Sequence, residues 1–460
     1  MSDDDAQPRR RAWDLDQYQT WGERPSGPDP FGKRALDEED EAALAASLDE
    51  RRIRARYRDD GTLFLTALKA AVLSVVTLGL YRFWMVTKLR RYYANAIRID
   101  GDPLEYTGTG IEKLLGFLLA LVVLAVYLGL VNLGLFFIGL SYFQGNPLAL
   151  QASVLALVPF WFWASYRARR YVLSRLRWRG IRFGAEGGAW GYTRRALGWS
   201  VLTVLTAGLA LPYQQFKQAQ YLTDRSWFGD LRFRQDGSWL GLMVWWIWLY
   251  VSAGVFALLT WGMVIEADYD PDFTGAAVGA MVTIWVVVAS VQMFAYRVGS
   301  FRYLWDNRVL GDAPLGNDVS IWRVFMIALW GYISVSFTTL IAALVIGGFV
   351  LGGWVLLGGP SLETVMAAGA EGERELALLS RAAASVPLAA LVVFGYLMVI
   401  AVAYALTQSL LIQPVLRRKV MAMQIDNPMA LREAAQRGHD SATEAGGFAD
   451  ALGIDVGAGF

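Results

Sequence analysis

The sequence contains no cysteine and a single histidine. The absence of cysteine excludes disulfides, thiolate nucleophiles, iron–sulfur clusters and zinc sites with thiolate ligands. The histidine, His439, lies in a polar C-terminal stretch, so metal sites and histidine-based acid–base catalysis lack their usual side chains. We therefore expect no metal, no cofactor and no enzymatic activity.

Charge is also scarce. Charged residues make up 18% of the 460 residues, against about 25% in soluble domains, and hydrophobic residues make up 55%. This composition indicates a protein that is solvated by lipid. The formal net charge of +1 argues against a nucleic-acid partner, because nucleic-acid-binding domains concentrate positive charge. The first residues, MSDDDAQPRRRAWDLDQ, lack the apolar run of a cleavable signal peptide.

Eight apolar stretches follow a polar N-terminal region. A helix needs about 20 residues to cross a hydrocarbon core about 30 Å thick, and six of the stretches pair into hairpins. The eight stretches cover residues 63–84, 114–143, 149–165, 197–213, 239–265, 275–297, 321–357 and 385–412.

The charges at the helix ends predict an orientation. Acidic residues gather at the hairpin tips, and Arg and Lys gather at the opposite ends, which the positive-inside rule places in the cytoplasm. Segments 63–84 and 197–213 break this pattern if they cross the membrane, and both contain a glycine break, at Gly79 and Gly208. We predict that these two segments are re-entrant or interfacial, with six full spans and both termini in the cytoplasm. The alternative is eight spans.

These features predict a domain organisation. Residues 1–60 form a polar, largely disordered cytoplasmic tail, whose last part, AALAASLDERRIRARY, is expected to be a short amphipathic helix on the lipid headgroups. Residues 61–424 form the transmembrane domain, and residues 425–460 form a cytoplasmic C-terminal tail. The expected fold class is all-α, a polytopic membrane helix bundle built from repeated units.

The repeated unit is a hydrophobic helix that ends in basic and aromatic residues. Sliding the sequence by 79 residues aligns Trp84 with Trp163, and sliding it by 129 residues aligns Gly79 with Gly208. Weaker copies end the next two hairpins, which gives five copies in total. We interpret them as duplications of one unit.

We call the basic and aromatic residues of the first two copies the collar. Their tryptophans suit the hydrocarbon boundary, and their cations suit anionic headgroups, at about 1 kcal/mol each. The collar either anchors the helices or forms a basic ring that binds anionic lipid or an acidic partner. The candidate collar residues are Trp84, Lys88, Arg90, Arg91, Tyr92, Trp163, Arg167, Arg169, Arg170, Tyr171 and Arg177.

One stretch is specific enough to suggest a family. The run TLGLYRFWMVTKLRRYYANAIRIDGDPLEYTGTG (residues 77–110), together with the closing GGFADALGIDVGAGF, resembles the YjgN-like family of bacterial inner-membrane proteins, a domain-of-unknown-function family. The resemblance covers roughly residues 60–460. It implies a multi-pass protein of the inner, cytoplasmic membrane, and it suggests a membrane metallopeptidase as a partner. The family has no assigned catalytic residues.

Few polar residues lie inside the apolar stretches. Lys69 lies near a helix end, where its ammonium can snorkel to the interface, and Asn132, Gln292 and Gln408 form interhelical hydrogen bonds or line a path.

Two small residues in a later stretch suggest a packing site. Gly348 and Gly352 form a GxxxG motif, which favours helix packing, within the chain or in a homo-oligomer, or a flexible gate.

Two functions remain open from the sequence. The first is a non-enzymatic scaffold or a module that binds lipid or a protein partner. The alternative is a transporter or channel for a lipid-like or other amphiphilic cargo, because long helices and internal repeats are common in transporters.

Overall fold

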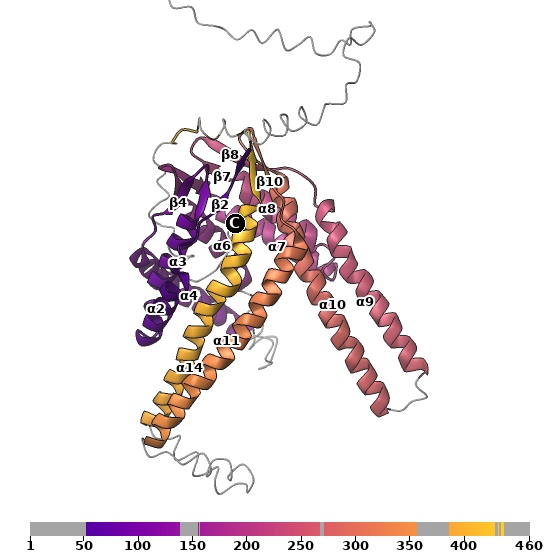
Figure 1. Cartoon of the computed structure of the whole chain (residues 1–460). Helices are drawn as coiled ribbons and strands as arrows, with labels where there is room; N and C mark the ends of the chain where they lie inside the picture. Colours follow the sequence, from indigo (N-terminus) through magenta and orange to yellow (C-terminus); the bar gives the residue numbers. More distant parts are fainter. Residues whose placement is uncertain are drawn as a thin grey trace, which may run out of the picture. The chain divides into compact units, whose positions relative to one another are not determined.

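A computed structural model of the chain describes residues 52–138, 155, 157–266, 271–356, 386–427, 431 and 434–436. Long helices alternate with short strands (Figure 1). The helices are α2 (Leu63–Val76), α3 (Arg82–Ala96), α4 (Gly110–Ile138), α6 (Leu157–Ser174), α7 (Ala189–Leu205), α8 (Leu211–Asp224), α9 (Leu240–Glu266), α10 (Pro271–Asp306), α11 (Ile321–Leu356), α14 (Val386–Leu406), the π-helix η3 (Thr407–Ile412) and α15 (Gln413–Met421). The strands are β1 (Arg52–Arg54), β2 (Arg56–Tyr57), β3 (Ile97–Ile99), β4 (Asp102–Tyr106), β5 (Leu176–Trp178), β6 (Ile181–Ala185), β7 (Ser226–Phe228), β8 (Leu231–Gln235), β9 (Arg308–Leu310), β10 (Ala313–Asn317) and β11 (Met423–Asp426).

The predicted all-α fold class is wrong, because the strands form an antiparallel sheet of 11 strands. Each of four hairpins consists of a strand of three residues, a two-residue turn and a strand of five residues. The sequence does not reveal these strands, because the hairpins that they form are short and each hairpin directly follows a helix. Their polar turn residues then resemble those of an ordinary loop. Residues 52–57, part of the predicted amphipathic helix, form β1 and β2.

The sheet closes on itself through its first segment. β1 pairs with β11, and β2 pairs with β3, so one short stretch of chain joins the two ends of the sheet. Between β1 and β2, the N–H of Ala55 donates to the carbonyl oxygen of Met423 at 3.1 Å. Because every strand then has a neighbour on each side over part of its length, the sheet is a nearly closed ring with little free edge.

The inside of the ring is an apolar core. Alternate residues of each strand point inward, because side chains of a strand alternate between the two faces of a sheet. Trp178 and Phe228 are 1% and 0% exposed, and their ring centroids lie 5.6 Å apart. Leu431, from the stretch after β11, is buried in the same core. The ring is therefore packed with side chains and does not form a pore.

The same hydrogen bond links each hairpin to the strand that follows it in the chain. The residue after the second strand of the hairpin donates its N–H to a carbonyl oxygen. That oxygen belongs to the residue just before the next strand of the ring. The four bonds join Thr107 to Arg175 (2.8 Å), Glu186 to Arg225 (2.9 Å), Asp236 to Asn307 (2.8 Å) and Asp318 to Ala422 (3.0 Å). Hairpins β5–β6 and β7–β8 begin 79 and 129 residues after β3–β4, the offsets at which the sequence aligns with itself. Duplication of one unit stays a prediction.

The hairpin turns need backbone angles that favour glycine. In the β5–β6 turn, Arg179 and Gly180 have φ angles of 51° and 77°. Both values lie in the left-handed region of the type I′ turns that join twisted strands.

We expect Gly180→Val to lower the free energy of unfolding by about 1–2 kcal/mol, because a β-branched residue is strained at positive φ. The measurement is the midpoint of thermal unfolding in detergent. Gly198→Ala is the control: it lies within α7, with open space around the added methyl group, and should leave the midpoint unchanged or raise it. Equal midpoints for the two variants would contradict this account of the turn.

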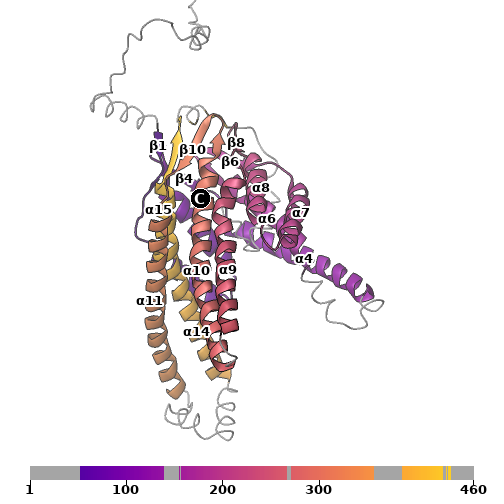
Figure 2. The same ribbon diagram turned by 90° about the vertical axis from the view of Figure 1, so that its right-hand side faces the viewer.

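Five helices of the described part are long and apolar enough to cross a membrane. They are Gly110–Phe137, Leu240–Ile265, Gly275–Asp306, Ile321–Leu356 and Ala389–Met421. Figure 2 shows α9, α10, α11 and α14 running from the ring to the same side of it. The apolar stretch at 149–165 lies partly outside the described residues, so six spans stay a prediction.

The two segments with a glycine break form helical hairpins. α2 and α3 are separated by a turn in which Leu78 and Gly79 have positive φ angles, and α7 and α8 by a turn in which Ala207 and Gly208 do. α2–α3 begins after β2 and returns to β3, while α7–α8 begins after β6 and returns to β7. Because β2 pairs with β3 and β6 pairs with β7, each hairpin leaves the ring and returns to it.

Candidate functional site

The ring lies where the candidate spans end. Each of the five is joined to a strand of the ring by four residues or fewer. In α10, the 24 residues between Asp272 and Arg297 carry no charged side chain, a length of about 36 Å at 1.5 Å per residue. This length matches a hydrocarbon core about 30 Å thick. We therefore expect Arg297 to lie near the level of the headgroups; α10 continues beyond it to Asp306, and the ring begins at Arg308.

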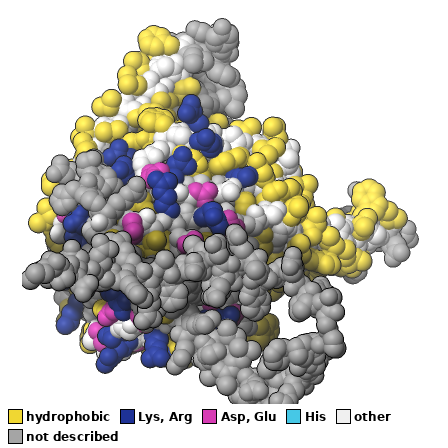
Figure 3. Space-filling view, turned by 90° about the horizontal axis from the view of Figure 1, so that it is seen from above, with side chains coloured by type: hydrophobic (Ala, Val, Ile, Leu, Met, Phe, Trp, Pro, Cys, Tyr) yellow, Lys and Arg dark blue, Asp and Glu magenta, His cyan; other side chains and the backbone are white. Residues whose placement is uncertain are grey.

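Many arginines of the ring have acidic partners. Viewed from the ring end, basic and acidic side chains are interspersed, with hydrophobic side chains around them (Figure 3). The ion pairs are Arg52–Asp426 (2.9 Å), Arg179 with Asp100 and Asp102, Arg232–Glu186 (2.9 Å) and Arg234–Asp236 (2.9 Å).

Other arginines face each other. Arg56 lies directly opposite Arg98 on neighbouring strands, and Arg177 lies opposite Arg182. Like charges in such positions repel. Arg177, one of the predicted collar residues, also lies opposite Glu105 on its other side. The outer face of β2–β6 therefore carries more positive than negative charge.

The collar residues of α3 mainly hold the structure together. Trp84 packs against the start of α4, where a Cβ atom on Gly110 would lie 2.7 Å from the indole ring. The Nζ of Lys88 donates to the Tyr81 hydroxyl at 2.6 Å. Lys88 is exposed, so its charge stays accessible to anions.

The last turns of α3 make further contacts with the ring. Arg91 donates to the carbonyl oxygen of Gly108 at 3.3 Å, and Arg90 is partly buried. The Tyr92 hydroxyl donates to the carboxylate of Asp59. Burial and this hydrogen bond raise the pKa of Tyr92, so the phenol keeps its proton.

The collar residues of α6 lie among aromatic rings. Trp163 packs against Trp190, with ring centroids 6.3 Å apart, and the Arg167 guanidinium lies 5.0 Å from the Trp163 ring centroid. Tyr171 is buried and donates to Glu112 at 2.9 Å, and Arg175 pairs with the same carboxylate at 3.0 Å. These contacts tie α6 to the start of α4.

Arg169 differs from the other collar residues. Among the described residues its Nε atom is buried without a hydrogen-bond partner, and its side chain is partly exposed. Burial lowers the pKa of Arg169, and burial together with Arg169 lowers the pKa of Arg308 to about 9. With a pKa of about 9, the Arg308 side chain stays charged at neutral pH.

Three arginines meet at the loop between β6 and α7, which we call the arginine cluster: Arg170, Arg195 and Arg225. Arg170 donates to the carbonyl oxygen of Ala185 at 3.0 Å. The guanidinium carbons of Arg195 and Arg225 lie 5.3 Å and 3.9 Å from the ring centroid of Tyr221. The Tyr221 hydroxyl in turn donates to the loop.

Glycines make room for these side chains. A Cβ atom on Gly188 would lie 3.0 Å from the Tyr221 hydroxyl and 3.3 Å from Arg225 Nε, and one on Gly191 would lie 2.7 Å from the same hydroxyl and 3.3 Å from Arg195 Nη1. The loop therefore brings cationic groups within about one helical turn of each other.

Nearby carboxylates are bonded elsewhere. Glu186 pairs with Arg232 at 2.9 Å, and Asp224 accepts the N–H of Gln235 at 2.8 Å. The geometry suits an anion with several acceptor oxygens, such as a phosphate.

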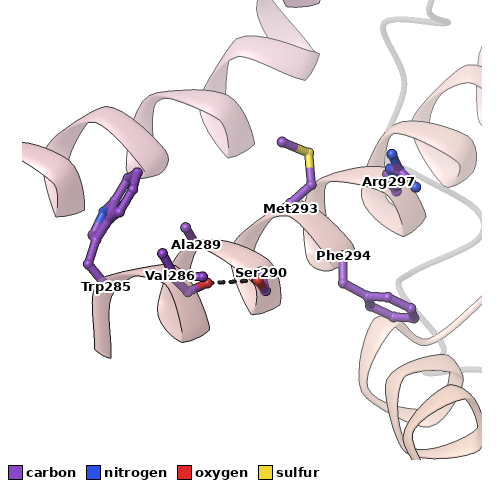
Figure 4. Close-up of a pocket in the computed structure, with 7 residues that line it drawn as sticks. All are labelled: Trp285, Val286, Ala289, Ser290, Met293, Phe294 and Arg297. Atoms are coloured by element: carbon purple, nitrogen blue, oxygen red, sulfur yellow. Dashed lines mark hydrogen bonds between the residues drawn. The ribbon is translucent and has the colours of Figure 1, made fainter. Parts of the chain in front are cut away.

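A groove runs along one face of α10 (Figure 4). Its volume is about 500 Å³. Apolar side chains make up most of its wall, with Trp285 near one end and Arg297 at the other. The residues that line it are Trp285, Val286, Ala289, Ser290, Met293, Phe294 and Arg297.

The predicted helix-packing glycines lie on an open face. A Cβ atom added to Gly348 or Gly352 would meet no described atom within 4 Å. Close contact between α11 and α14 instead uses Gly353, which faces Leu391, and Gly395, which faces Val350.

The amide side chains of Asn132, Gln292 and Gln408 contact different residues and do not contact one another. Asn132 donates to Leu128 of its own helix at 2.9 Å, and Gln292 accepts from Ser252 at 2.9 Å. Gln408 accepts from the Tyr93 hydroxyl at 2.7 Å. None of the three lines the groove on α10.

Arg195 and Arg225 lie outside the predicted collar. The signal for their site is the pair Gly187-Gly188 between a strand and a helix, because adjacent glycines mark a close approach of other groups to the backbone. Recognising this signal requires knowing that a strand precedes the glycines, and the strands were absent from the predicted fold.

Comparison with known proteins gives two matches. The family described as "Bacterial protein of unknown function (DUF898)" matches residues 59–340, more than half of the chain. "Inner membrane protein YjgN" of Salmonella typhimurium is 26% identical over 126 residues, which are 27% of this chain and 29% of that protein. The chain thus matches less than a third of that relative's length. No solved structure matches. The chain belongs to the DUF898 family, the YjgN-like family of bacterial membrane proteins.

Proposed function

We propose that this protein is a non-enzymatic module of the bacterial inner membrane that binds anionic lipid headgroups at the cytoplasmic surface. The arginine cluster is the observation that carries the proposal. Its guanidinium groups lie around one loop of the ring, and the carboxylate of Glu186 in that loop pairs with Arg232 outside the cluster. The ring adjoins the ends of the candidate spans, so this loop lies within reach of headgroups.

Electrostatics favours an anion at this loop. Cations within about one helical turn of each other repel, and the repulsion is stronger near low-dielectric lipid than in water. An anionic phosphate placed among them removes the repulsion and accepts charge-assisted hydrogen bonds. Each basic side chain near an anionic surface contributes about 1 kcal/mol.

We expect the double variant Arg195→Gln/Arg225→Gln to lose anionic lipid relative to the unaltered protein. Two basic side chains correspond to about 2 kcal/mol, or roughly a thirtyfold weaker retention. The measurement is native mass spectrometry of the protein released from bilayers of mixed phosphatidylglycerol and phosphatidylcholine, with the bound lipids identified.

The control is Arg234→Gln. Arg234 is an exposed arginine of the same ring, but its guanidinium is paired with Asp236 at 2.9 Å. This variant should retain phosphatidylglycerol as the unaltered protein does. If the double variant and the control retain equal amounts of phosphatidylglycerol, the arginine cluster does not bind headgroups.

The topology is part of the proposal. Both termini lie in the cytoplasm, and α2–α3 and α7–α8 are re-entrant or interfacial hairpins. The return of each hairpin to the ring supports this arrangement, as do the exposed apolar residues at their tips, among them Leu78 and Leu205. The family resemblance alone suggests a membrane metallopeptidase as a partner, which co-purification from the native membrane tests.

A transporter of lipid-like cargo is the second candidate. The groove on α10 favours it, because this groove is apolar and lies along a candidate span. The packed interior of the ring counts against conduction through the ring itself. Transfer of a fluorescent phospholipid between the leaflets of reconstituted vesicles distinguishes the two functions, since a binding module should not accelerate it.

A further inference from the structure

The groove on α10 has a polar end and an apolar length. Trp285 and Arg297 are 12 residues apart, so the groove runs for about 18 Å along the helix. One leaflet of a hydrocarbon core about 30 Å thick measures about 15 Å. The groove therefore has the depth of a single leaflet, measured from the level of Arg297.

Arg297 marks the headgroup end of this groove. Its side chain is exposed, and in the part of the chain that the structure describes its guanidinium forms no ion pair or hydrogen bond. The groove below it contains no carboxylate and one hydroxyl, that of Ser290, which donates to the Val286 carbonyl oxygen of its own helix at 2.7 Å. A molecule that fits must be anionic at one end and apolar along the rest.

We propose that this groove binds one acyl chain of an anionic phospholipid from the cytoplasmic leaflet, with the lipid phosphate against Arg297. The inference rests on the proposed binding of anionic lipid and adds a site for an individual lipid molecule. In this proposal the acyl chain lies along Phe294, Met293 and Ala289 and ends near Trp285. Figure 4 shows these side chains. Arg297 selects the lipid by the charge of its headgroup, and the apolar wall of the groove holds its acyl chain.

A second groove provides a matched comparison. It lies between α9 and α10 with a volume of about 440 Å³, and it shares Trp285 with the first. None of the described residues that line it is charged; its walls include Ala257, Trp261 and Met281. A chain in this groove has no cation to meet its phosphate, so the second groove should accept lipids regardless of headgroup charge.

The test uses the absence of cysteine from the sequence. Ala289→Cys places a fluorescent label in the first groove, and Ala257→Cys places one in the second. Each labelled protein is reconstituted in phosphatidylcholine that contains brominated phosphatidylglycerol or, separately, brominated phosphatidylcholine at the same fraction. Bromine quenches the fluorophore when a brominated chain lies in the groove.

We expect the label at Ala289→Cys to report a preference of about fivefold for phosphatidylglycerol, the factor for one basic side chain near the surface. Adding Arg297→Gln should abolish the preference, and Ala257→Cys should show none. Arg297 is exposed, so its replacement should not disturb folding. Binding of a protein segment instead of lipid would leave the Ala289→Cys label unquenched by both lipids and would overturn the proposal.

Two further results would also overturn the proposed acyl-chain site. Neither affects the separate test of the arginine cluster. Equal quenching by the two lipids at Ala289→Cys means that Arg297 does not select. A preference that survives Arg297→Gln but disappears in Arg195→Gln/Arg225→Gln means that the headgroup lies at the arginine cluster. In either case, retention of phosphatidylglycerol measured by mass spectrometry still decides the proposed function.

Discussion

Replacing Trp178 by alanine lowers the free energy of unfolding by about 4 kcal/mol, because it removes a large side chain from the centre of the ring. Trp178 is 1% exposed, packs against Phe228, and donates its indole N–H to the carbonyl oxygen of Ile99 at 3.3 Å. The substitution therefore leaves a cavity at the centre of the ring and removes one hydrogen bond to the backbone. The measurement is unfolding in denaturant, in a detergent that keeps the protein monodisperse.

Trp330→Ala is the control for this prediction. Trp330 is 64% exposed on α11, within a candidate span, so its removal takes contacts away from lipid or detergent more than from the protein. We expect a change below about 1 kcal/mol. If the two tryptophan variants unfold at the same denaturant concentration, the ring does not have the packed core described for it.

Gln235→Leu should cost about 3 kcal/mol, because it leaves polar groups buried without partners. Gln235 is 2% exposed and donates its amide N–H groups to the carbonyl oxygens of Leu304 and Asn307, each at 3.0 Å. Its carbonyl oxygen accepts from Arg308 Nε at 3.0 Å. This one side chain joins the end of β8 to the end of α10, and leucine can form none of these bonds.

A double-mutant cycle separates the contribution of Arg308. Arg308→Leu alone removes a cation whose pKa burial depresses to about 9, and the double variant Gln235→Leu/Arg308→Leu leaves no guanidinium without an acceptor. We expect the double variant to be more stable than the sum of the two single changes predicts, by about 1–2 kcal/mol. Additive effects would mean that the Gln235–Arg308 hydrogen bond contributes nothing measurable.

The long helices follow from the sequence because their signal is long. Each of the five candidate spans overlaps a predicted apolar stretch, since a run of 20 or more apolar residues has few alternatives to a membrane helix. The breaks at Gly79 and Gly208 also lie where the sequence places them, because positive φ at these positions requires glycine or strains another residue.

The strands of the ring cannot be predicted from hydrophobic runs in the same way. They are two to five residues long, so each contributes only a few inward apolar side chains, too few for a clear period. The sequence IRIDGDPLEY does contain the relevant signal, because Asp100-Gly101 lies between alternating apolar and charged residues, the pattern of a tight hairpin. Pro103 obscures it, since proline within a run argues against a strand.

The arginine cluster shares one residue, Arg170, with the collar predicted from the sequence, and the collar's role in binding stays a prediction. The sequence identifies the basic collar, and the structure gives most of its members structural contacts, for example between Tyr171 and Glu112 and between Arg91 and Gly108. It cannot show which arginines meet, because Arg170, Arg195 and Arg225 come together only when β6 pairs with β7. Sheet pairing between distant segments is a property of the fold and leaves little trace in local sequence.

The placement of the ring at the cytoplasmic membrane surface is the claim on which the proposed lipid sites depend. Labelling of single cysteines with an impermeant maleimide tests it, at Arg234→Cys on the ring and at Gly275→Cys near the opposite end of α10. The account predicts that intact spheroplasts label only Gly275→Cys, and that inverted membrane vesicles label only Arg234→Cys. Labelling of Arg234→Cys from outside intact spheroplasts would contradict it.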